Sequence, residues 1–370
     1  MKIGVTGQNG FIGWHLSQTF KYIFPLEFKL IPFERNFFYH EDLLDKFTSD
    51  CNCIIHLAGV NRDSDESNIK KVNIELSKKL IESFDRIKFK GKLIFSSSYK
   101  EDTKTLYGIS KKEARENFIL ASKRIGFMFT GLIIPNVYGP FCKPNYNSFI
   151  ATFCYQISRD INPKIIHDNE VELIYVDNLV KQIINCIKSE PIIDYRVSNY
   201  KRIRVSLVLD LIRSFHNEYA KQNKIPKLDN TFKLELFNTY RSYLKINRYP
   251  IKHKNNIDQR GNFVETMKTL SGGQFSFSTT EPGIERGNHF HTRKIERFSV
   301  IKGNAEIKLR KIGTKTTDSF KLTGDSPSFI DMPLWYTHNL KNIGKDKLIT
   351  LFWINELYDK KDPDTYLEIV

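Results

Sequence analysis

Two groups of residues have the types and the spacing that chemistry requires. The first is Tyr107 with Lys111, which share one face of a predicted helix because residues four apart are neighbours there. A lysine ammonium one turn away favours the phenolate and lowers the pKa of the tyrosine. Such a phenol can exchange a proton with a carbonyl while hydride is transferred, and the hydroxyl of Ser98 would polarise that carbonyl.

The second group is formed by three histidines and a glutamate. His289 and His291 are two residues apart, so on a strand their side chains point to the same face. Glu296 follows on the next turn or strand, and His338 lies on a later strand. A lone histidine is more often a core or surface residue, but three imidazoles and a carboxylate suit a divalent transition metal. We therefore predict a metal site there.

A hydride donor requires a cofactor-binding element, and the start of the chain provides one. Residues 1–6 predict a buried strand, and a glycine-rich loop leads from it into a helical stretch at residues 14–20. Strand, glycine loop and helix form a dinucleotide-binding unit, in which the backbone approaches the pyrophosphate closely and the helix N-terminus faces it. The predicted contacts in this loop are Gly7, Asn9, Gly10, Phe11, Ile12 and Gly13.

The strands that follow end in residues suited to a cofactor. After residues 28–33, Glu34 could accept from the ribose of NAD and Arg35 could pair with the 2′-phosphate of NADP; we favour Arg35 and NADPH. Buried strands are also predicted at residues 53–59 and 92–98. The further predicted cofactor contacts are Leu57, Ala58, Gly59, Asn73, Tyr107 and Lys111.

A polar loop follows Gly139 and Pro140, beyond another strand end. It predicts contacts to a sugar or a diphosphate, although a solvated loop explains its composition nearly as well. The predicted substrate contacts are Asn136, Lys143, Asn145, Tyr146 and Asn147.

A change of pattern divides the chain into two predicted domains. Strand–helix alternation runs to about residue 219, whereas from residue 255 short strands are separated by regularly spaced glycines, which predicts an all-β barrel or sandwich. The length of 370 residues also favours two domains. We place the dinucleotide-binding domain at residues 1–247 and the metal-binding domain at residues 248–370.

Composition excludes several classes of function. The net charge is +15, but the lysines are scattered over helical patterns without interleaved aromatic residues, so we expect no nucleic acid partner. No stretch approaches the roughly 20 apolar residues of a membrane span. The 5 cysteines form no C-x-x-C pair and no export signal is evident, so we expect a cytoplasmic protein with reduced thiols.

Residues 1–240 resemble the extended short-chain dehydrogenase/reductase family. The resemblance implies a Rossmann-type, doubly wound parallel sheet, catalytic roles for Ser98, Tyr107 and Lys111, and a nucleotide-sugar substrate. Only eight residues separate Ser98 from Tyr107, so Ser97 is the alternative hydroxyl. The matching motifs are Thr6-Gly7-x-x-Gly10-x-x-Gly13, His56-Leu-Ala-Gly59, Asn73, Ser96-Ser-Ser98, Tyr107-x-x-x-Lys111, Pro135-Asn-Val-Tyr-Gly-Pro140 and Tyr175-Val-Asp177.

Residues 255–360 resemble the cupin family. The resemblance implies an all-β barrel in which His289, His291, Glu296 and His338 bind the metal. One departure is Trp335, which stands where the family usually has glycine. The matching motifs are Gly283-x5-His289-x-His291-x4-Glu296-x6-Gly303 and Pro333-x4-His338-x3-Asn342.

Together the halves resemble bifunctional capsular-polysaccharide enzymes of UDP-N-acetyl-L-fucosamine synthesis. That resemblance implies C3 epimerisation of UDP-2-acetamido-2,6-dideoxy-L-arabino-4-hexulose, a UDP-activated 4-keto-6-deoxy-amino sugar, in the cupin domain. NADPH-dependent reduction at C4 to UDP-2-acetamido-2,6-dideoxy-L-talose follows in the dehydrogenase domain. It also implies zinc and a homodimer or homotetramer. The alternatives are a C4-reductase with a structural or dimerising cupin, a related pathway such as that to N-acetyl-L-rhamnosamine, and a regulatory protein without turnover.

Overall fold

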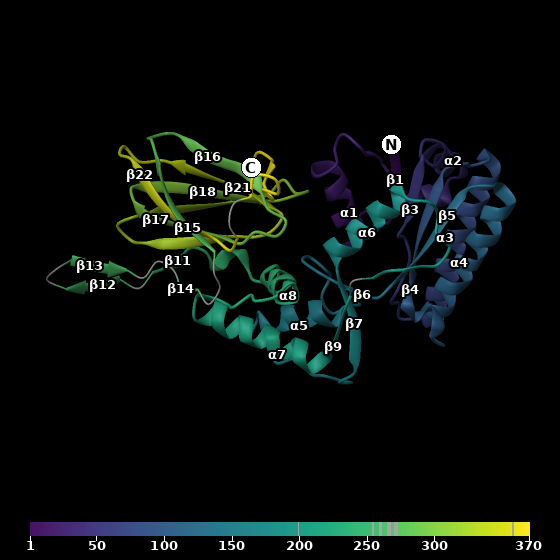
Figure 1. Ribbon diagram of the computed structural model, residues 1–370, viewed down its shortest axis with the longest axis horizontal. Helices are drawn as coiled ribbons and strands as arrows, with labels where there is room; N and C mark the ends of the chain where they lie inside the picture. The colour runs from purple at the N-terminus through teal and green to yellow at the C-terminus, as the bar shows by residue number, and fades with distance from the viewer. Residues whose placement is uncertain (199, 254, 259–260, 265–267, 270–272, 357–358) are drawn as a thin grey trace. The chain divides into compact units, whose positions relative to one another are not determined.

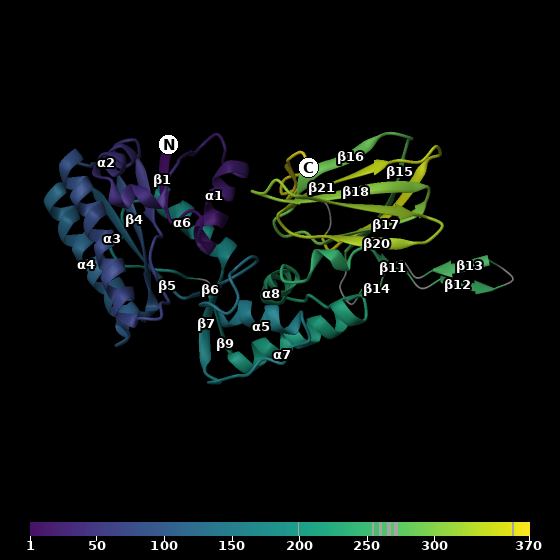
Figure 2. The same ribbon diagram turned by 180° about the vertical axis from the view of Figure 1, so that it is seen from behind.

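The computed structural model describes residues 1–198, 200–253, 255–258, 261–264, 268–269, 273–356 and 359–370. The chain forms two compact units (Figures 1 and 2). The first consists of Met1–Thr152 and Ile165–Ser206, and the second of Phe153–Lys164 and Leu207–Val370. The domain boundary predicted at residues 247/248 falls inside the second unit and stays a prediction. None of the described helices is long and apolar enough to cross a membrane.

A parallel six-stranded sheet, in the order β2-β1-β3-β4-β5-β8, is the centre of the first unit. Its central strands are nearly continuous apolar runs, as expected for strands that are covered on both faces. The strands are β1 (Lys2–Thr6), β2 (Lys29–Ile31), β3 (Cys53–His56), β4 (Lys92–Ser98), β5 (Met128–Ile134) and β8 (Tyr195–Arg196).

Helices pack on both faces of this sheet (Figure 1). On one face, Leu16 and Phe20 of α1 pack in one core with Val5 and with α6. On the other face, Phe84 of α3 and Phe118 of α4 belong to a second core, which also includes α2. This is the predicted doubly wound α/β fold. The helices are α1 (Phe11–Tyr22), α2 (Glu41–Ser49), α3 (Glu66–Ile87), α4 (Leu106–Ile125) and α6 (Val176–Lys188).

The strand order reverses at β1, because β2 lies on one side of it and β3 on the other. Doubly wound sheets bind their ligands at such a switch point, outside the carboxyl ends of the strands. A smaller sheet, β6-β7-β9, completes the unit. The remaining elements are the 3-10 turns η1 (Arg35–Tyr39) and η2 (Tyr99–Asp102), and the strands β6 (Asn136–Tyr138), β7 (Glu170–Tyr175) and β9 (Lys201–Arg204).

Two antiparallel five-stranded sheets form most of the second unit, in the orders β11-β20-β17-β22-β15 and β19-β18-β21-β16-β23. Val300, Ile307, Ile330 and Leu340 belong to one buried core that draws on both sheets, which confirms the predicted all-β cupin barrel. The strands are β11 (Ile251–Lys252), β15 (Gln274–Thr280), β16 (Glu285–Phe290), β17 (Glu296–Lys302), β18 (Asn304–Lys311), β19 (Thr317–Thr323), β20 (Ser328–Met332), β21 (Tyr336–Asn342), β22 (Leu348–Ile354) and β23 (Tyr366–Leu367).

A buried polar contact fixes the segment before residue 248 to the barrel. Arg297 of β17 and Asp331 of β20 form an ion pair with Nε and Oδ1 2.7 Å apart, and the hydroxyl of Tyr219 donates to Asp331. This contact explains why the unit begins before the predicted boundary. The other elements are α5 (Phe149–Ile157) and α7 (Val205–Phe215), which cross the unit boundary, with η3 (His216–Lys221), β10 (Lys224–Ile225), α8 (Thr231–Arg241), η4 (Ile246–Arg248), β12 (Asn255–Asp258), β13 (Gly261–Val264) and β14 (Lys268–Thr269).

Candidate active site and metal centre

The loop after β1 makes the tight turn that its glycines predict. Gly7 has a φ of +77°, and a Cβ there would lie 2.8 Å from the backbone nitrogen of Ala58. A Cβ on Gly13 would lie 2.2 Å from the carbonyl oxygen of Gly7, so a side chain cannot fit. Gly10 precedes α1 and gives it no side-chain cap. The first amide groups of the helix therefore remain available to a phosphate. Asn9 lies in the same loop, and Phe11 and Ile12 are the first two residues of the helix.

The loop after β3 lies against this turn, as the close approach of Ala58 to Gly7 shows. Leu57 and Gly59 flank Ala58 in the same loop. Asn73 holds the loop from α3: its Oδ1 accepts from the backbone nitrogen of Val60 at 2.7 Å and its Nδ2 donates to the carbonyl of Val60 at 2.9 Å. Asn73 thus shapes the loop, and its contact with a cofactor remains a prediction.

The residues that would select the cofactor follow β2. Glu34 and Arg35 are both exposed at the start of η1. The side chain of Gln8 in the glycine loop donates to the carbonyl of Phe33 at 2.6 Å, which ties the loop to this strand end. Arg35 follows this contact by two residues, and its role in a preference for NADPH remains a prediction.

Ser98 at the end of β4 and Tyr107 in the first turn of α4 lie together, as predicted, because a side-chain hydrogen bond joins them. Ser97, the alternative hydroxyl, donates instead to the buried carboxylate of Glu101. That carboxylate also forms an ion pair with Arg115 at 2.8 Å. The structure thus brings Ser98, and not Ser97, to the phenol.

Lys111 lies 5.9 Å from the centre of the Tyr107 ring, but its Nζ donates to the carbonyl of Ser96 at 2.8 Å. Burial lowers the pKa of Lys111 to about 8. Burial also raises the pKa of Tyr107 to about 12, and the hydrogen bond from Ser98 offsets only part of that rise. The net shift is therefore upward, which corrects the expectation that the pKa of the phenol is lowered. Tyr107 is therefore protonated at neutral pH, which suits a proton donor.

Asn136 begins β6 and is held by two hydrogen bonds. Its Oδ1 accepts from the hydroxyl of Tyr99 at 3.3 Å, and its Nδ2 donates to the carbonyl of Glu172 at 3.2 Å. Because Tyr99 directly follows Ser98, Asn136 is anchored near the end of β4.

The other predicted substrate contacts form an exposed loop. Lys143 places its Nζ 5.1 Å from the centre of the Tyr146 ring, and Asn145 and Asn147 flank that tyrosine. Arg62, which the sequence analysis missed, donates to the carbonyls of Asn145 at 3.3 Å and Tyr146 at 2.7 Å. A single arginine in a polar loop belongs to no motif, so only the fold reveals that it holds this loop.

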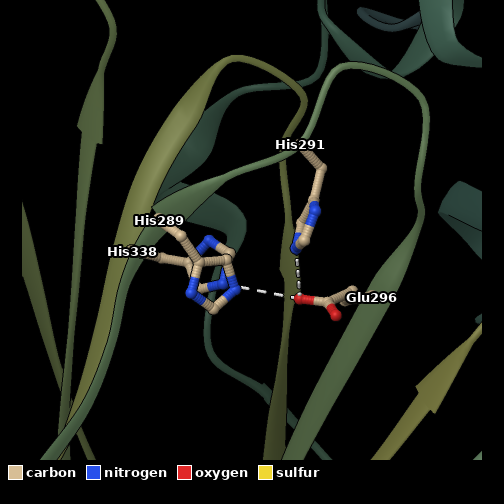
Figure 3. A group of neighbouring side chains, drawn as sticks. All are labelled: His289, His291, Glu296 and His338. Carbon is tan, nitrogen blue, oxygen red and sulfur yellow. Dashed lines mark ion pairs between the residues drawn. The ribbon is translucent and has the colours of Figure 1, made fainter. Parts of the chain in front are cut away.

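The three histidines and the glutamate converge as predicted (Figure 3). His289 in β16 is paired in register with His338 in β21, and Glu296 begins β17 in the other sheet. His291 follows β16 directly. The ligand atoms of the four side chains all lie within 4.8 Å of one another. Strand register within one sheet and packing between two sheets together build this cluster.

The cluster fits a divalent metal. Glu296 Oε2 lies 3.0 Å from the Nε2 of His291 and 3.4 Å from the Nε2 of His338. These three atoms are buried, and within the described part of the chain none of them has a hydrogen-bond partner of acceptable geometry. Buried polar atoms without partners are rare and costly. A cation at their centre would satisfy all three, and imidazole with carboxylate is a donor set that zinc accepts.

The pKa shifts of His289 and Glu296 favour the forms that bind a metal. Burial, and then the charges of the neighbouring histidines, lower the pKa of His289 to about 4. For Glu296, burial opposes ionisation, but the nearby His291 outweighs it and holds the pKa of the carboxyl below its usual range. A neutral imidazole and an ionised carboxylate are the forms that bind metals.

Trp335 shows why the cupin pattern usually has glycine at its position. Its φ is +59°, in the left-handed region that glycine adopts most easily. The backbone nitrogen of Trp335 donates to the carbonyl of His291 at 2.9 Å, and its ring stacks on Phe290 at 5.3 Å between centroids. The turn before β21 is thereby held against the strand that carries the first two histidines.

Comparison with known families agrees with both halves of this architecture. Residues 3–195 match the NAD dependent epimerase/dehydratase family, and residues 256–366 match the polysaccharide biosynthesis C-terminal domain. The chain belongs to the NAD dependent epimerase/dehydratase family. The predicted combination of dehydrogenase and cupin is confirmed by relatives that match over the full length.

One such relative is the UDP-2-acetamido-2,6-beta-L-arabino-hexul-4-ose reductase of Pseudomonas aeruginosa, which is 33% identical over 99% of this chain and 98% of its own length. The capsular polysaccharide assembling protein CapF of Staphylococcus aureus has a similar solved structure, with 31% identity, a TM-score of 0.64 and full coverage of both chains. RMD from Pseudomonas aeruginosa, solved in complex with NADPH, shares only the fold: the identity is 18% and the TM-score 0.51, over 58% of this chain and 83% of that one.

Proposed function

We propose that this protein is a bifunctional enzyme of surface polysaccharide synthesis. Its first unit reduces the C4 ketone of a UDP-activated 2-acetamido-2,6-dideoxy-4-hexulose with NADPH, and its barrel inverts C3 of the same sugar beforehand. The observation that carries the proposal is the hydrogen-bonded pair Ser98 and Tyr107 at the sheet edge that also holds the glycine loop. The full-length relative, a reductase named for a sugar of this class, supports the substrate.

The cofactor would be held by the glycine loop, the loop at residues 57–59 and Arg35. When bound, NADPH supplies a hydride to C4 of the sugar. Gly7 and Gly13 keep side chains away from the pyrophosphate, and the amide groups at the start of α1 donate to it. The guanidinium of Arg35 pairs with the 2′-phosphate, which a carboxylate such as Glu34 would repel.

Tyr107 donates the proton of the reduction. As a C–H bond forms at C4, the π bond of the ketone breaks towards O4, and the phenolic proton moves to O4 to give the alcohol. Ser98 donates a hydrogen bond to the same oxygen and orients it. The ammonium of Lys111 stabilises the phenolate that remains, because opposite charges attract strongly in a buried site.

The barrel would catalyse proton exchange at C3, whose proton is acidified by the adjacent C4 ketone. A metal held by His289, His291, Glu296 and His338, which we propose is zinc, would supply positive charge near the oxygen that becomes negative. Tyr336 lies two residues before His338 on β21, so both side chains face the same side of the sheet. A base, for which a histidine beside the metal is the candidate, would remove the C3 proton, and the electron pair of the C–H bond would move towards O4 to give an enolate. Burial raises the pKa of Tyr336, so its phenol is protonated and can return a proton to the opposite face of C3.

Product analysis by NMR tests the proposal. The protein is incubated with a UDP-4-keto-6-deoxy-N-acetylhexosamine and NADPH in deuterated water. We expect deuterium at C3 and a hydroxyl at C4 of the product. Reduction at C4 without deuterium at C3 would show that the protein is a C4-reductase whose cupin domain is structural or dimerising. Absence of NADPH oxidation would contradict the proposed function as a whole. The proposed homodimer or homotetramer is tested separately by the mass of the protein in solution.

A further inference from the structure

Residues 362–370 lie along the strand that carries the first metal ligand. In this segment, which we call the strap, β23 pairs antiparallel with β16, so that His289 is opposite Leu367 and Phe290 is opposite Tyr366. The backbone nitrogen of Glu368 donates to the carbonyl of Asn288 at 2.9 Å. The strap therefore extends the sheet next to the metal centre.

The carboxylate of Asp364 lies in the interior of the protein: the residue is only 1% exposed. Its Oδ1 accepts from the backbone nitrogen and the hydroxyl of Thr292, at 3.1 and 2.6 Å. Its Oδ2 accepts from the backbone nitrogens of Arg293 at 3.0 Å and Lys294 at 2.9 Å. These residues connect His291 to Glu296. Charge-assisted bonds to three successive amides fix the path of the backbone between two metal ligands.

The backbone of Asp364 contacts the metal centre as well. Its carbonyl oxygen lies 2.5 Å from the Nδ1 of His291. A carbonyl can only accept, so the proton of the ring must be on Nδ1. In the neutral ring the lone pair is then on Nε2, the nitrogen that lies 3.0 Å from Glu296 Oε2. The strap thus sets both the tautomer and the direction of the imidazole.

We propose that Asp364 is a positioning residue of the metal centre. Its side chain fixes the backbone between His291 and Glu296, and this keeps the carbonyl oxygen of Asp364 within hydrogen-bond distance of the His291 ring. The inference rests on the proposed metal site. Partners of this kind, which do not touch the metal, typically change metal affinity by about 10- to 100-fold when they are replaced.

The variant Asp364→Asn tests the role. Asparagine has nearly the same shape and tolerates a positive φ, such as the +39° of Asp364, so the backbone is not strained. The substitution replaces one acceptor oxygen by an NH2 group, which cannot accept from the backbone N–H groups that it would face. The matched control is Asp362→Asn, because Asp362 lies on the same strap but its largely exposed carboxylate contacts the guanidinium of Arg293, at 2.9 and 3.1 Å, instead of backbone amides.

Metal affinity is measured with Zn²⁺ against a chromophoric chelator, and Co²⁺ is added separately to record the visible spectrum of the site. We expect Asp364→Asn to weaken zinc binding by about 10- to 100-fold and to alter the cobalt spectrum. We expect Asp362→Asn to stay within about 3-fold of the unsubstituted protein. A circular dichroism melt of each metal-free variant separates loss of the site from loss of the fold.

The outcomes distinguish the two proposals. If the unsubstituted protein binds no metal, the proposed metal site itself is wrong. If it binds metal and Asp364→Asn behaves like Asp362→Asn, the positioning role of Asp364 is wrong. Should Asp364→Asn unfold, Thr292→Val removes only the hydroxyl donor to the same carboxylate, and unchanged metal affinity and cobalt spectrum in that variant would also overturn the inference.

Discussion

The two sites of this protein are built in different ways. In the first unit, the candidate residues lie on loops and first helical turns at the carboxyl ends of parallel strands, where backbone groups remain available to a ligand. In the barrel, the four side chains come from two sheets, and the contacting atoms of His291, Glu296 and His338 are buried with no hydrogen-bond partner of acceptable geometry among the described residues. The first site therefore leaves backbone groups open to a ligand, whereas in the second the side chains that could hold a metal ion already lie together.

This difference predicts that the two sites can be disabled separately. The largest effect is expected for Tyr107→Phe, which keeps the ring but removes the proton that O4 must receive. General acid catalysis contributes typically about 10²- to 10⁴-fold, so NADPH oxidation with the keto sugar should fall by that factor. Retention of the normal rate would contradict the role of Tyr107, and an unchanged melting temperature would show that the fold is intact.

The next effect distinguishes the two neighbouring serines. Ser98→Ala removes a donor to the reacting oxygen, and loss of such a donor costs about 10²- to 10³-fold in kcat. Ser97→Ala removes a buried hydrogen bond to Glu101 and should lower thermal stability instead. Steady-state kinetics and thermal melts on the two variants check this. If kcat fell more in Ser97→Ala than in Ser98→Ala, Ser97 and not Ser98 would be the donor to the reacting oxygen.

The barrel is tested by His338→Gln, which removes one ligand and leaves the dehydrogenase unit unaltered. Loss of a direct ligand should weaken zinc binding by more than about 100-fold, the upper range for residues outside the coordination shell. Zinc titration against a chelator measures this. Equal affinity in variant and unsubstituted protein would show that the cluster is not a metal site.

The smallest effect concerns pH. Lysine acts here as a cation, and burial lowers the pKa of Lys111 to about 8 in the cofactor-free protein. The charge is present below that pH and lost above it, so with a pKa of about 8 the charged fraction at pH 9 is about one tenth. NADPH affinity should therefore fall by up to about tenfold between pH 7 and pH 9. In Lys111→Arg the charge persists at pH 9, so the decrease in NADPH affinity should disappear. If the affinity of this variant still decreased, a group other than Lys111 would be responsible.

The sequence was sufficient where function depends on local spacing. Gly10 and Gly13 predict their turn because both lie against Gly7 in the same loop, and Tyr107 and Lys111 lie one helical turn apart because they are four residues apart. The convergence of His289 and His338 was predicted from residue types and spacing, but their register was not, since strand pairing across such a separation is set by the whole sheet.

Other features depend on tertiary contacts that a pattern cannot contain. Ser98 is preferred over Ser97 because Glu101, itself paired with Arg115, binds the latter. The raised pKa of Tyr107 follows from burial, and sequence spacing alone suggested the opposite direction. No role was predicted for Asp364, and its role becomes visible only when the strap pairs with β16.

The central claim is that one chain carries two separable reactions on one sugar. The most direct test is deuterium exchange at C3 of the UDP-4-keto sugar, measured by NMR without NADPH, in Tyr107→Phe and in His338→Gln side by side. We predict that Tyr107→Phe still exchanges the C3 proton and that His338→Gln does not. Exchange at C3 in both variants would contradict this claim. So would the reverse result, in which Tyr107→Phe loses the exchange and His338→Gln keeps it.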